Sequence, residues 1–188
     1  MHLLVGLGNP GSQYEGTRHN VGFMALDRLV VRHGLGAGQE KFQSLLYRGR
    51  IGGIAVILAK PRTYMNLSGE AVGRIVDYYG VPVAKILVLH DDMDIEVGRL
   101  KVAARGGAGG HKGVSSIIQR LGEDAFARIK IGVGRPPAGW TAENWVLGRF
   151  TDEETKTVES VLDSAGAAAE LFISDGAAEA QTRYNRKT

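Results

Sequence analysis

Cysteine is absent from this 188-residue chain. Its absence excludes disulfide bonds, thiolate nucleophiles and cysteine-ligated metals, and it fits a cytoplasmic location, which we expect here. Long hydrophobic runs are also absent, because Gly6, Asn9 and Pro10 interrupt the first apolar run. We therefore expect neither a signal peptide nor a membrane-spanning segment, and no membrane partner.

The chain has only a small excess of basic over acidic residues, and its net charge is +3. Such a balance permits a nucleic-acid partner without requiring one, so the placement of the charges has to decide. The stretch from Arg99 to Arg135 contains eight basic residues, counting both ends, against only Glu123 and Asp124. This stretch is consistent either with solvated faces or with a surface that faces phosphates, and both readings stay open from charge alone.

Alternating apolar and amphipathic segments predict a single α/β domain over residues 1–188. The composition, 44% hydrophobic and 23% charged residues, is ordinary for a soluble globular protein with a sizeable core. Strands are expected at residues 3–7, 85–90, 99–104 and 128–134, a hairpin at 42–48 and 51–59 around Gly49, and helices from the Asn20 cap onward and at 66–79, 114–121 and 151–174. Hairpin and crossover connections both occur, so we expect a twisted, mixed but mostly parallel sheet flanked by helices.

The first strand is followed by a sequence that resembles a dinucleotide-binding motif. Residues 6–11 fit the pattern G-x-G-x-x-G, in which a helix begins at the glycines and its N-terminus binds a pyrophosphate. Here the residues after Gly11 keep the chain in a loop until about Asn20, and the region near Val30 is typical of a helix end rather than of a second strand. No nucleotide cofactor is therefore expected.

Polar side chains follow three of the predicted strands, and the carboxyl ends of neighbouring parallel strands meet at one edge of a sheet. The three loops carry, in order, Asn9, Tyr14 and His19; Lys60, Tyr64, Met65 and Asn66; and His90, Asp91, Asp92 and Asp94. A histidine paired with a carboxylate can activate water, and side-chain amides can hold a carbonyl group. The residues thus predict a hydrolase site at the carboxyl ends of the strands.

Each of these residues also has a simpler interpretation. Asn9 can shape a turn, His19 and Asn20 can form a helix N-cap pair, and Asn66 can cap its own helix. The three aspartates of residues 91–94 can bind Mg²⁺, as in a metal-dependent phosphoesterase. The glycine-rich residues 106–110 can form a mobile loop.

Five segments in register resemble the bacterial-type peptidyl-tRNA hydrolases: residues 5–11 with Tyr14, 17–22, 60–69, 90–94 and 109–113. The resemblance extends over nearly the whole chain. It implies a monomeric enzyme with one α/β domain, no cofactor and no metal, which hydrolyses the ester between peptide and tRNA in peptidyl-tRNA and so recycles tRNA from aborted translation. The scaffold also resembles non-catalytic plastid splicing factors, but the polar set described next is intact here.

The resemblance assigns roles to individual residues. His19 is similar to the family's catalytic base and Asp91 to its orienting partner. The implied substrate-binding residues are Asn9, Tyr14, Met65, Asn66 and His111, and the implied tRNA phosphate contacts are Lys101 and Lys130. One position departs from the pattern, because Lys112 stands where the family often has asparagine. Lys112 cannot accept a hydrogen bond, so we expect it to bind the substrate electrostatically instead.

Overall fold

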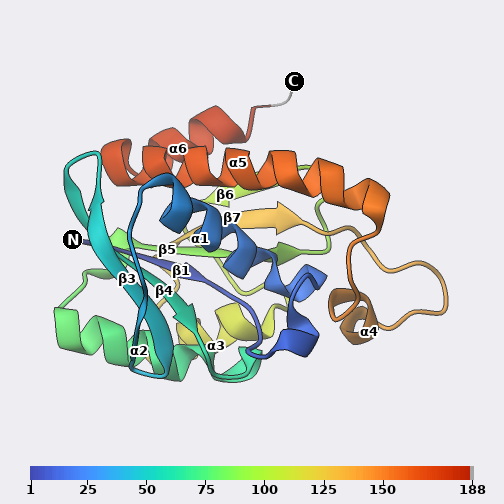
Figure 1. Ribbon diagram of the computed structural model, residues 1–188, viewed down its shortest axis with the longest axis horizontal. Coiled ribbons are helices and arrows are strands. Elements are labelled where there is room, and N and C mark those ends of the chain that lie inside the picture. Colours follow the sequence, from blue (N-terminus) through green and yellow to red (C-terminus); the bar gives the residue numbers. More distant parts are fainter. Residues whose placement is uncertain (187–188) are drawn as a thin grey trace.

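A seven-stranded mixed sheet forms the centre of the protein in the computed structural model, which describes residues 1–186 (Figure 1). The strands are β1 (His2–Gly6), β2 (Gln39–Lys41), β3 (Ser44–Ile51), β4 (Ile54–Pro61), β5 (Ile86–Asp92), β6 (Leu100–Ala103) and β7 (Ala127–Gly132). Their order across the sheet is β2-β3-β4-β1-β5-β7-β6. The four strands β4, β1, β5 and β7 are mutually parallel, whereas β2, β3 and β6 pair antiparallel to their neighbours. The predicted fold class is confirmed.

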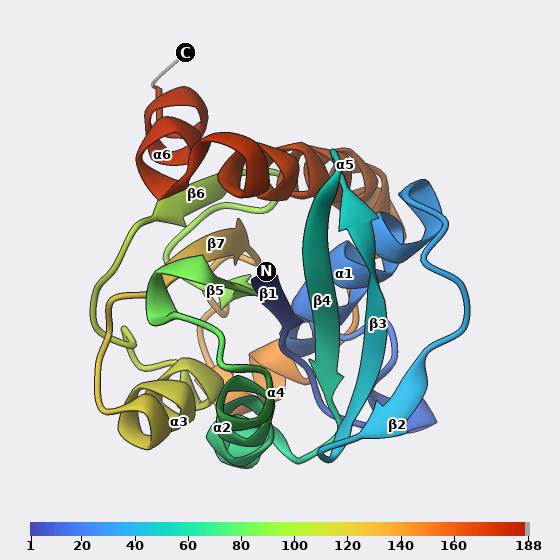
Figure 2. The same ribbon diagram turned by 90° about the vertical axis from the view of Figure 1, so that its left-hand side faces the viewer.

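Helices cover both faces of the sheet (Figures 1 and 2). They are α1 (Val21–Arg32), α2 (Ser68–Tyr79), α3 (Lys112–Leu121), α4 (Ala142–Val146), α5 (Asp152–Asp175) and α6 (Ala177–Tyr184). Along β1 the side chains alternate between two cores: Leu4 packs with residues of α1 and α5, while Leu3 and Val5 pack with residues of α2 and α3. A strand that is covered on both faces needs apolar residues at every position, which explains its continuous apolar sequence.

The predicted hairpin exists, but its turn was placed wrongly. Gly49 lies within β3 opposite Val56, and the chain reverses at Gly52 and Gly53. These two glycines have φ values of 56° and 79°, the backbone that a two-residue hairpin turn requires and that glycine adopts without strain. Strand β2 and helix α4 were not predicted, because each is too short to show a periodic pattern.

The carboxyl ends of β1, β4 and β5 open toward the same edge of the sheet, next to α4 (Figure 1). This edge is where the loops after the three strands meet. Within residues 1–186, no helix combines the length and the apolar character needed to cross a lipid bilayer.

Candidate active site

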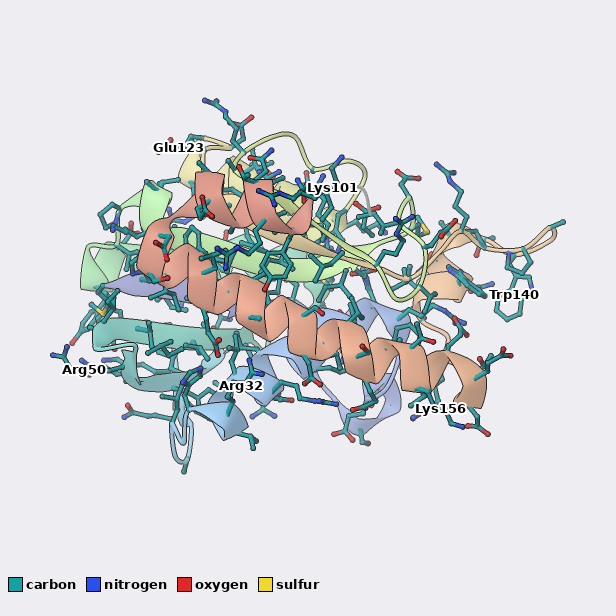
Figure 3. All side chains as sticks on the ribbon, turned by 90° about the horizontal axis from the view of Figure 1, so that it is seen from above. Arg32, Arg50, Lys101, Glu123, Trp140 and Lys156 are labelled. Carbon is teal, nitrogen blue, oxygen red and sulfur yellow. The ribbon has the colours of Figure 1, made fainter. Side chains whose placement is uncertain are left out.

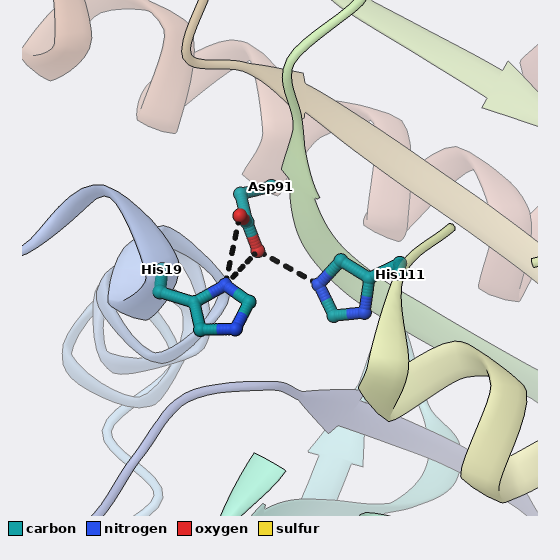
Figure 4. A group of neighbouring side chains, drawn as sticks. All are labelled: His19, Asp91 and His111. Atoms are coloured by element: carbon teal, nitrogen blue, oxygen red, sulfur yellow. Dashed lines mark hydrogen bonds and ion pairs between the residues drawn. The ribbon is translucent and has the colours of Figure 1, made fainter. Parts of the chain in front are cut away.

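His19 and Asp91 form a close pair at this edge of the sheet (Figure 4). His19 lies in a single helical turn before α1, and its Nδ1 is 3.0 Å from Oδ1 and 2.9 Å from Oδ2 of Asp91, near the end of β5. An ionised carboxylate only accepts hydrogen bonds, so the proton of the neutral imidazole lies on Nδ1. Nε2 of His19 therefore carries a lone pair, as a general base requires.

His111 is the second histidine bound to Asp91 (Figure 4). Its Nε2 lies 2.8 Å from Oδ1 of Asp91, while its Nδ1 accepts hydrogen bonds from the amides of Gly113 and Val114 at 3.1 and 3.3 Å. A nitrogen that accepts two amide protons carries none itself, so the proton of His111 lies on Nε2 and is donated to Asp91. His111 thus caps α3 and fixes the carboxylate at once. The sequence placed His111 in the cleft but gave no sign of either bond.

Asp91 is 3% exposed, and burial alone would raise the pKa of its carboxyl. The neighbouring His111 and His19 more than offset this effect, and the net pKa of Asp91 is lowered well below its usual value. The carboxylate therefore stays ionised at neutral pH. Beside it, burial lowers the pKa of His90 to about 3, so this histidine is neutral and donates from Nδ1 to the carbonyl oxygen of Asp91.

Two asparagines organise the loop after β1. The backbone amide of Asn9 donates to Oδ1 of Asn20 at 2.8 Å, and Nδ2 of Asn20 donates to the carbonyl oxygen of Asn9 at 3.0 Å. Asn20 was expected to cap α1 with its side chain, and that expectation is wrong, because the side chain holds the loop instead. Oδ1 of Asn9 in turn accepts from the amide of Met65 at 2.9 Å. This bond fixes the orientation of the Asn9 side-chain amide, so Nδ2 of Asn9 points away from Met65 and can donate to a ligand.

These residues border a cavity of about 580 Å³. Among the predicted site residues, the cavity lining includes Asn9, Tyr14, His19, Met65, Asn66, Asp91, His111, Lys112 and Lys130. Asn66 is exposed and does not cap α2, whose N-cap position is Leu67. Lys60, which the sequence grouped with the converging loops, instead pairs with Asp27 of α1 at 2.8 Å. The structure thus brings together nearly all of the predicted set.

Lys101 and Lys130 stand directly opposite each other in the antiparallel pair of β6 and β7. Lys130 lines the cavity, and Lys101 is exposed beside it on the outermost strand of the sheet. Lys112, the first residue of α3, is exposed at the mouth of the same cavity. The cavity therefore has cationic side chains on two of its borders.

Two buried arginines support the walls of the cavity. Arg128 is 1% exposed, and its Nη1 donates to the carbonyl oxygen of Gly107 at 2.9 Å, within the glycine-rich loop. Arg18 pairs with Glu154 at 2.9 Å, and its guanidinium carbon lies 3.5 Å from the ring centre of Trp145 in α4. Arg128 belongs to the basic stretch that was expected to face either solvent or phosphates. That expectation is wrong for Arg128, because its guanidinium is buried inside the protein.

Asp91, Asp92 and Asp94, at and just after the end of β5, do not gather as three carboxylate ligands. Oδ1 of Asp92 accepts from the amide of Asp94 at 2.7 Å, and Asp94 pairs with Arg135. In the part of the chain that the structure describes, the close group of potential ligand atoms is that of His19, Asp91 and His111, all within 4.8 Å of one another. Two imidazoles with one carboxylate do not form the oxygen-rich set that Mg²⁺ prefers.

Comparison with known proteins agrees with this geometry. The family model described as peptidyl-tRNA hydrolase matches residues 3–188. A peptidyl-tRNA hydrolase of Lachnoclostridium phytofermentans is 44% identical over 187 residues, covering 100% of this chain and 98% of its own. One of an Exiguobacterium species is 46% identical over 185 residues, covering 98% and 100%. The crystal structure of peptidyl-tRNA hydrolase from Acinetobacter baumannii superposes with a TM-score of 0.93 at 34% identity, covering 100% of this chain and 96% of that one. By sequence over nearly its whole length and by its fold, the chain belongs to the peptidyl-tRNA hydrolase family.

Proposed function

We propose that this protein hydrolyses the ester bond between peptide and tRNA in peptidyl-tRNA with a water molecule that His19 activates. The observation that carries this proposal is the hydrogen-bonded pair of His19 and the buried Asp91 at the cavity, which leaves a lone pair on Nε2 of His19. Such an enzyme would recycle tRNA from aborted translation. We further propose that it works as a monomer in the cytoplasm, without an obligate protein partner or a cofactor.

The reaction needs a proton acceptor and a partner for the oxyanion. Nε2 of His19 takes a proton from water as the oxygen attacks the ester carbonyl, and Asp91 stabilises the imidazolium that forms. Nδ2 of Asn9 and the amide of Asn66 supply donors for the negative charge that develops on the carbonyl oxygen. When the tetrahedral intermediate collapses, the bond to the ribose oxygen breaks and the imidazolium returns the proton to this leaving oxygen. Atoms and protons thus balance without another reactant.

The direct test is the release of N-acyl amino acid from purified N-acyl-aminoacyl-tRNA by the purified protein. Release with multiple turnovers supports the proposal. Binding of tRNA without release would instead support a non-catalytic RNA-binding protein on the same fold. Turnover that disappears in the presence of a chelator and returns with Mg²⁺ would support the metal-dependent alternative.

Replacing Lys101 or Lys130 with alanine is expected to raise KM for N-acyl-aminoacyl-tRNA. If these ammonium groups bind a tRNA phosphate, each replacement removes one counter-ion contact, and the slope of log affinity against log salt should fall by about one unit or less. The loss should be the same whatever peptide is attached. A short model ester without the phosphate should be hydrolysed at the parental rate.

Lys156→Ala is the matched control for these two variants. Lys156 is an exposed lysine on α5, and Figure 3 shows it well separated from Lys101. Lys156→Ala removes one positive charge, as Lys101→Ala and Lys130→Ala do. It therefore measures only the effect of the protein's net charge on tRNA binding. Equal losses on tRNA and on the short ester would reassign Lys101 and Lys130 to structural support.

Lys112→Ala tests the departure from the family pattern. We expect KM to rise at low salt and this rise to shrink as salt increases, since screening weakens a contact between an exposed ammonium and phosphate. The turnover number should change far less than in His19→Ala. A large loss of turnover that salt does not affect would place Lys112 in the chemical step and contradict this interpretation.

A further inference from the structure

The side chain of Asn185 occupies the place of a missing strand at the edge of the sheet. Its Oδ1 accepts from the amide of Val102 at 2.8 Å, and its Nδ2 donates to the carbonyl oxygen of Val102 at 2.7 Å. Val102 lies in β6, which is four residues long and, within residues 1–186, has a strand neighbour only on its β7 side. One side chain therefore satisfies both backbone groups that a further strand would otherwise bind.

Helix α6 fixes the position of this side chain. Asn185 follows the helix directly, and its own amide donates to the carbonyl oxygen of Gln181 at 3.0 Å. Ala180 of the same helix is fully buried in the core that α5 also contacts. Figures 1 and 2 both show α6 beside β6. The amide of Asn185 is thus presented to the strand from a packed element rather than from a free end of the chain.

The contact with Val102 shows toward which side of β6 the backbone groups of Lys101 point. Along a strand, successive residues turn their N–H and C=O groups to opposite edges, so Lys101 turns these groups toward β7 while Val102 turns them toward Asn185. The amide of Gly132 donates to the carbonyl oxygen of Arg99 at 2.9 Å. Because Arg99 stands two residues before Lys101, this bond agrees with backbone groups of Lys101 that point toward β7. Lys101 and Lys130 are therefore a hydrogen-bonded antiparallel pair, with Cα atoms about 5.5 Å apart.

This pairing places two like charges side by side on a short edge strand. Directly opposed like charges disfavour strand pairing, so repulsion between the two ammonium groups favours separation of β6 from β7. We propose that Asn185 is a positioning residue that holds β6 in place, so that Lys101 and Lys130 together bind one phosphate group of the RNA substrate. This inference rests on the proposed function, because it assumes that the two lysines contact the substrate.

The test is Asn185→Ala, assayed on N-acyl-aminoacyl-tRNA and on a short model ester. We expect KM for the tRNA substrate to rise roughly fivefold with kcat unchanged, the size of effect that loss of one phosphate contact produces. The short ester should be hydrolysed at the parental rate, and hydrogen exchange of the Val102 amide should become faster. Gln181→Ala is the matched control, because this exposed residue lies on α6 one turn before Asn185.

A double-mutant cycle separates positioning from general stabilisation. In the Lys101→Ala background, Asn185→Ala should add little to KM, because the ammonium that it positions is already gone. A lower melting temperature and faster exchange with an unchanged KM would reduce Asn185 to a purely structural role and overturn the inference. If Lys101→Ala and Lys130→Ala themselves leave KM unchanged, the phosphate contact fails instead. If both raise KM and Asn185→Ala does not, only the positioning role fails.

Discussion

Replacing His19 with alanine should lower kcat for N-acyl-aminoacyl-tRNA by roughly two to four powers of ten, the usual contribution of a positioned acid–base group. The variant keeps the cavity, the amide donors and the buried carboxylate, so KM should change little. The free energy of unfolding should also change little, since the His19 side chain belongs to neither apolar core and Asp91 keeps its bond to His111. Single-turnover hydrolysis measures the rate of the chemical step, and chemical denaturation measures the free energy of unfolding.

The chain contains a matched control for this substitution. Nε2 of His33, the residue directly after α1, lies 2.8 Å from Oε1 of Glu170 in α5, and the two form a second histidine–carboxylate pair. His33→Ala also removes an imidazole that is paired with a carboxylate, but His33 does not line the cavity. This variant should leave kcat unchanged. Turnover of His19→Ala within a factor of about three of the parent enzyme would contradict the general-base mechanism, because the smallest expected loss is about a hundredfold.

The convergence of the loops that carry His19 and Asp91 was predictable from the sequence by one topological rule. Buried strands carry continuous apolar runs, such as residues 3–5 of β1 and 86–89 of β5, and polar residues at the carboxyl ends of parallel neighbours meet at one edge. Local sequence shows where each strand ends. The choice of Asp91 as the partner of His19, 72 positions away, came instead from the resemblance to the peptidyl-tRNA hydrolases, because topology alone left Asp92 and Asp94 as candidates too.

The supporting contacts were not predictable, because they depend on partners that are distant in sequence or on tertiary burial. Asn20 has a sequence typical of an N-cap, yet its amide binds the loop at Asn9 in the folded protein. Arg128 belongs to a residue type that is seldom fully buried, and only the fold shows that loop carbonyl groups receive its guanidinium. Asn185 lies near the end of the chain, where nothing in the sequence points to β6.

Asp91→Asn should lower kcat by roughly two powers of ten or more, because the amide cannot satisfy both histidines in their present tautomers. Nδ1 of His19 lies within 3.0 Å of both carboxylate oxygens, so one of its two partners would become an N–H₂ donor. His111 cannot adapt, since its Nδ1 accepts from two amides of α3 and its Nε2 must keep the proton. The adjustment falls on His19, whose proton then moves to Nε2 and leaves no lone pair for the attacking water.

The double variant tests whether Asp91 acts through His19. If Asp91 acts through His19, then His19→Ala with Asp91→Asn should be no slower than the slower of the two single variants, because groups that act as a unit are not additive. Nitrogen chemical shifts of the His19 imidazole in Asp91→Asn should show the Nε2–H tautomer, while those of His111 stay unchanged. Additive losses would contradict this coupling and show that Asp91 acts independently of His19. An unchanged His19 tautomer in a slow enzyme would show instead that Asp91 contributes through its charge, which stabilises the imidazolium, and that the position of the proton does not limit the rate.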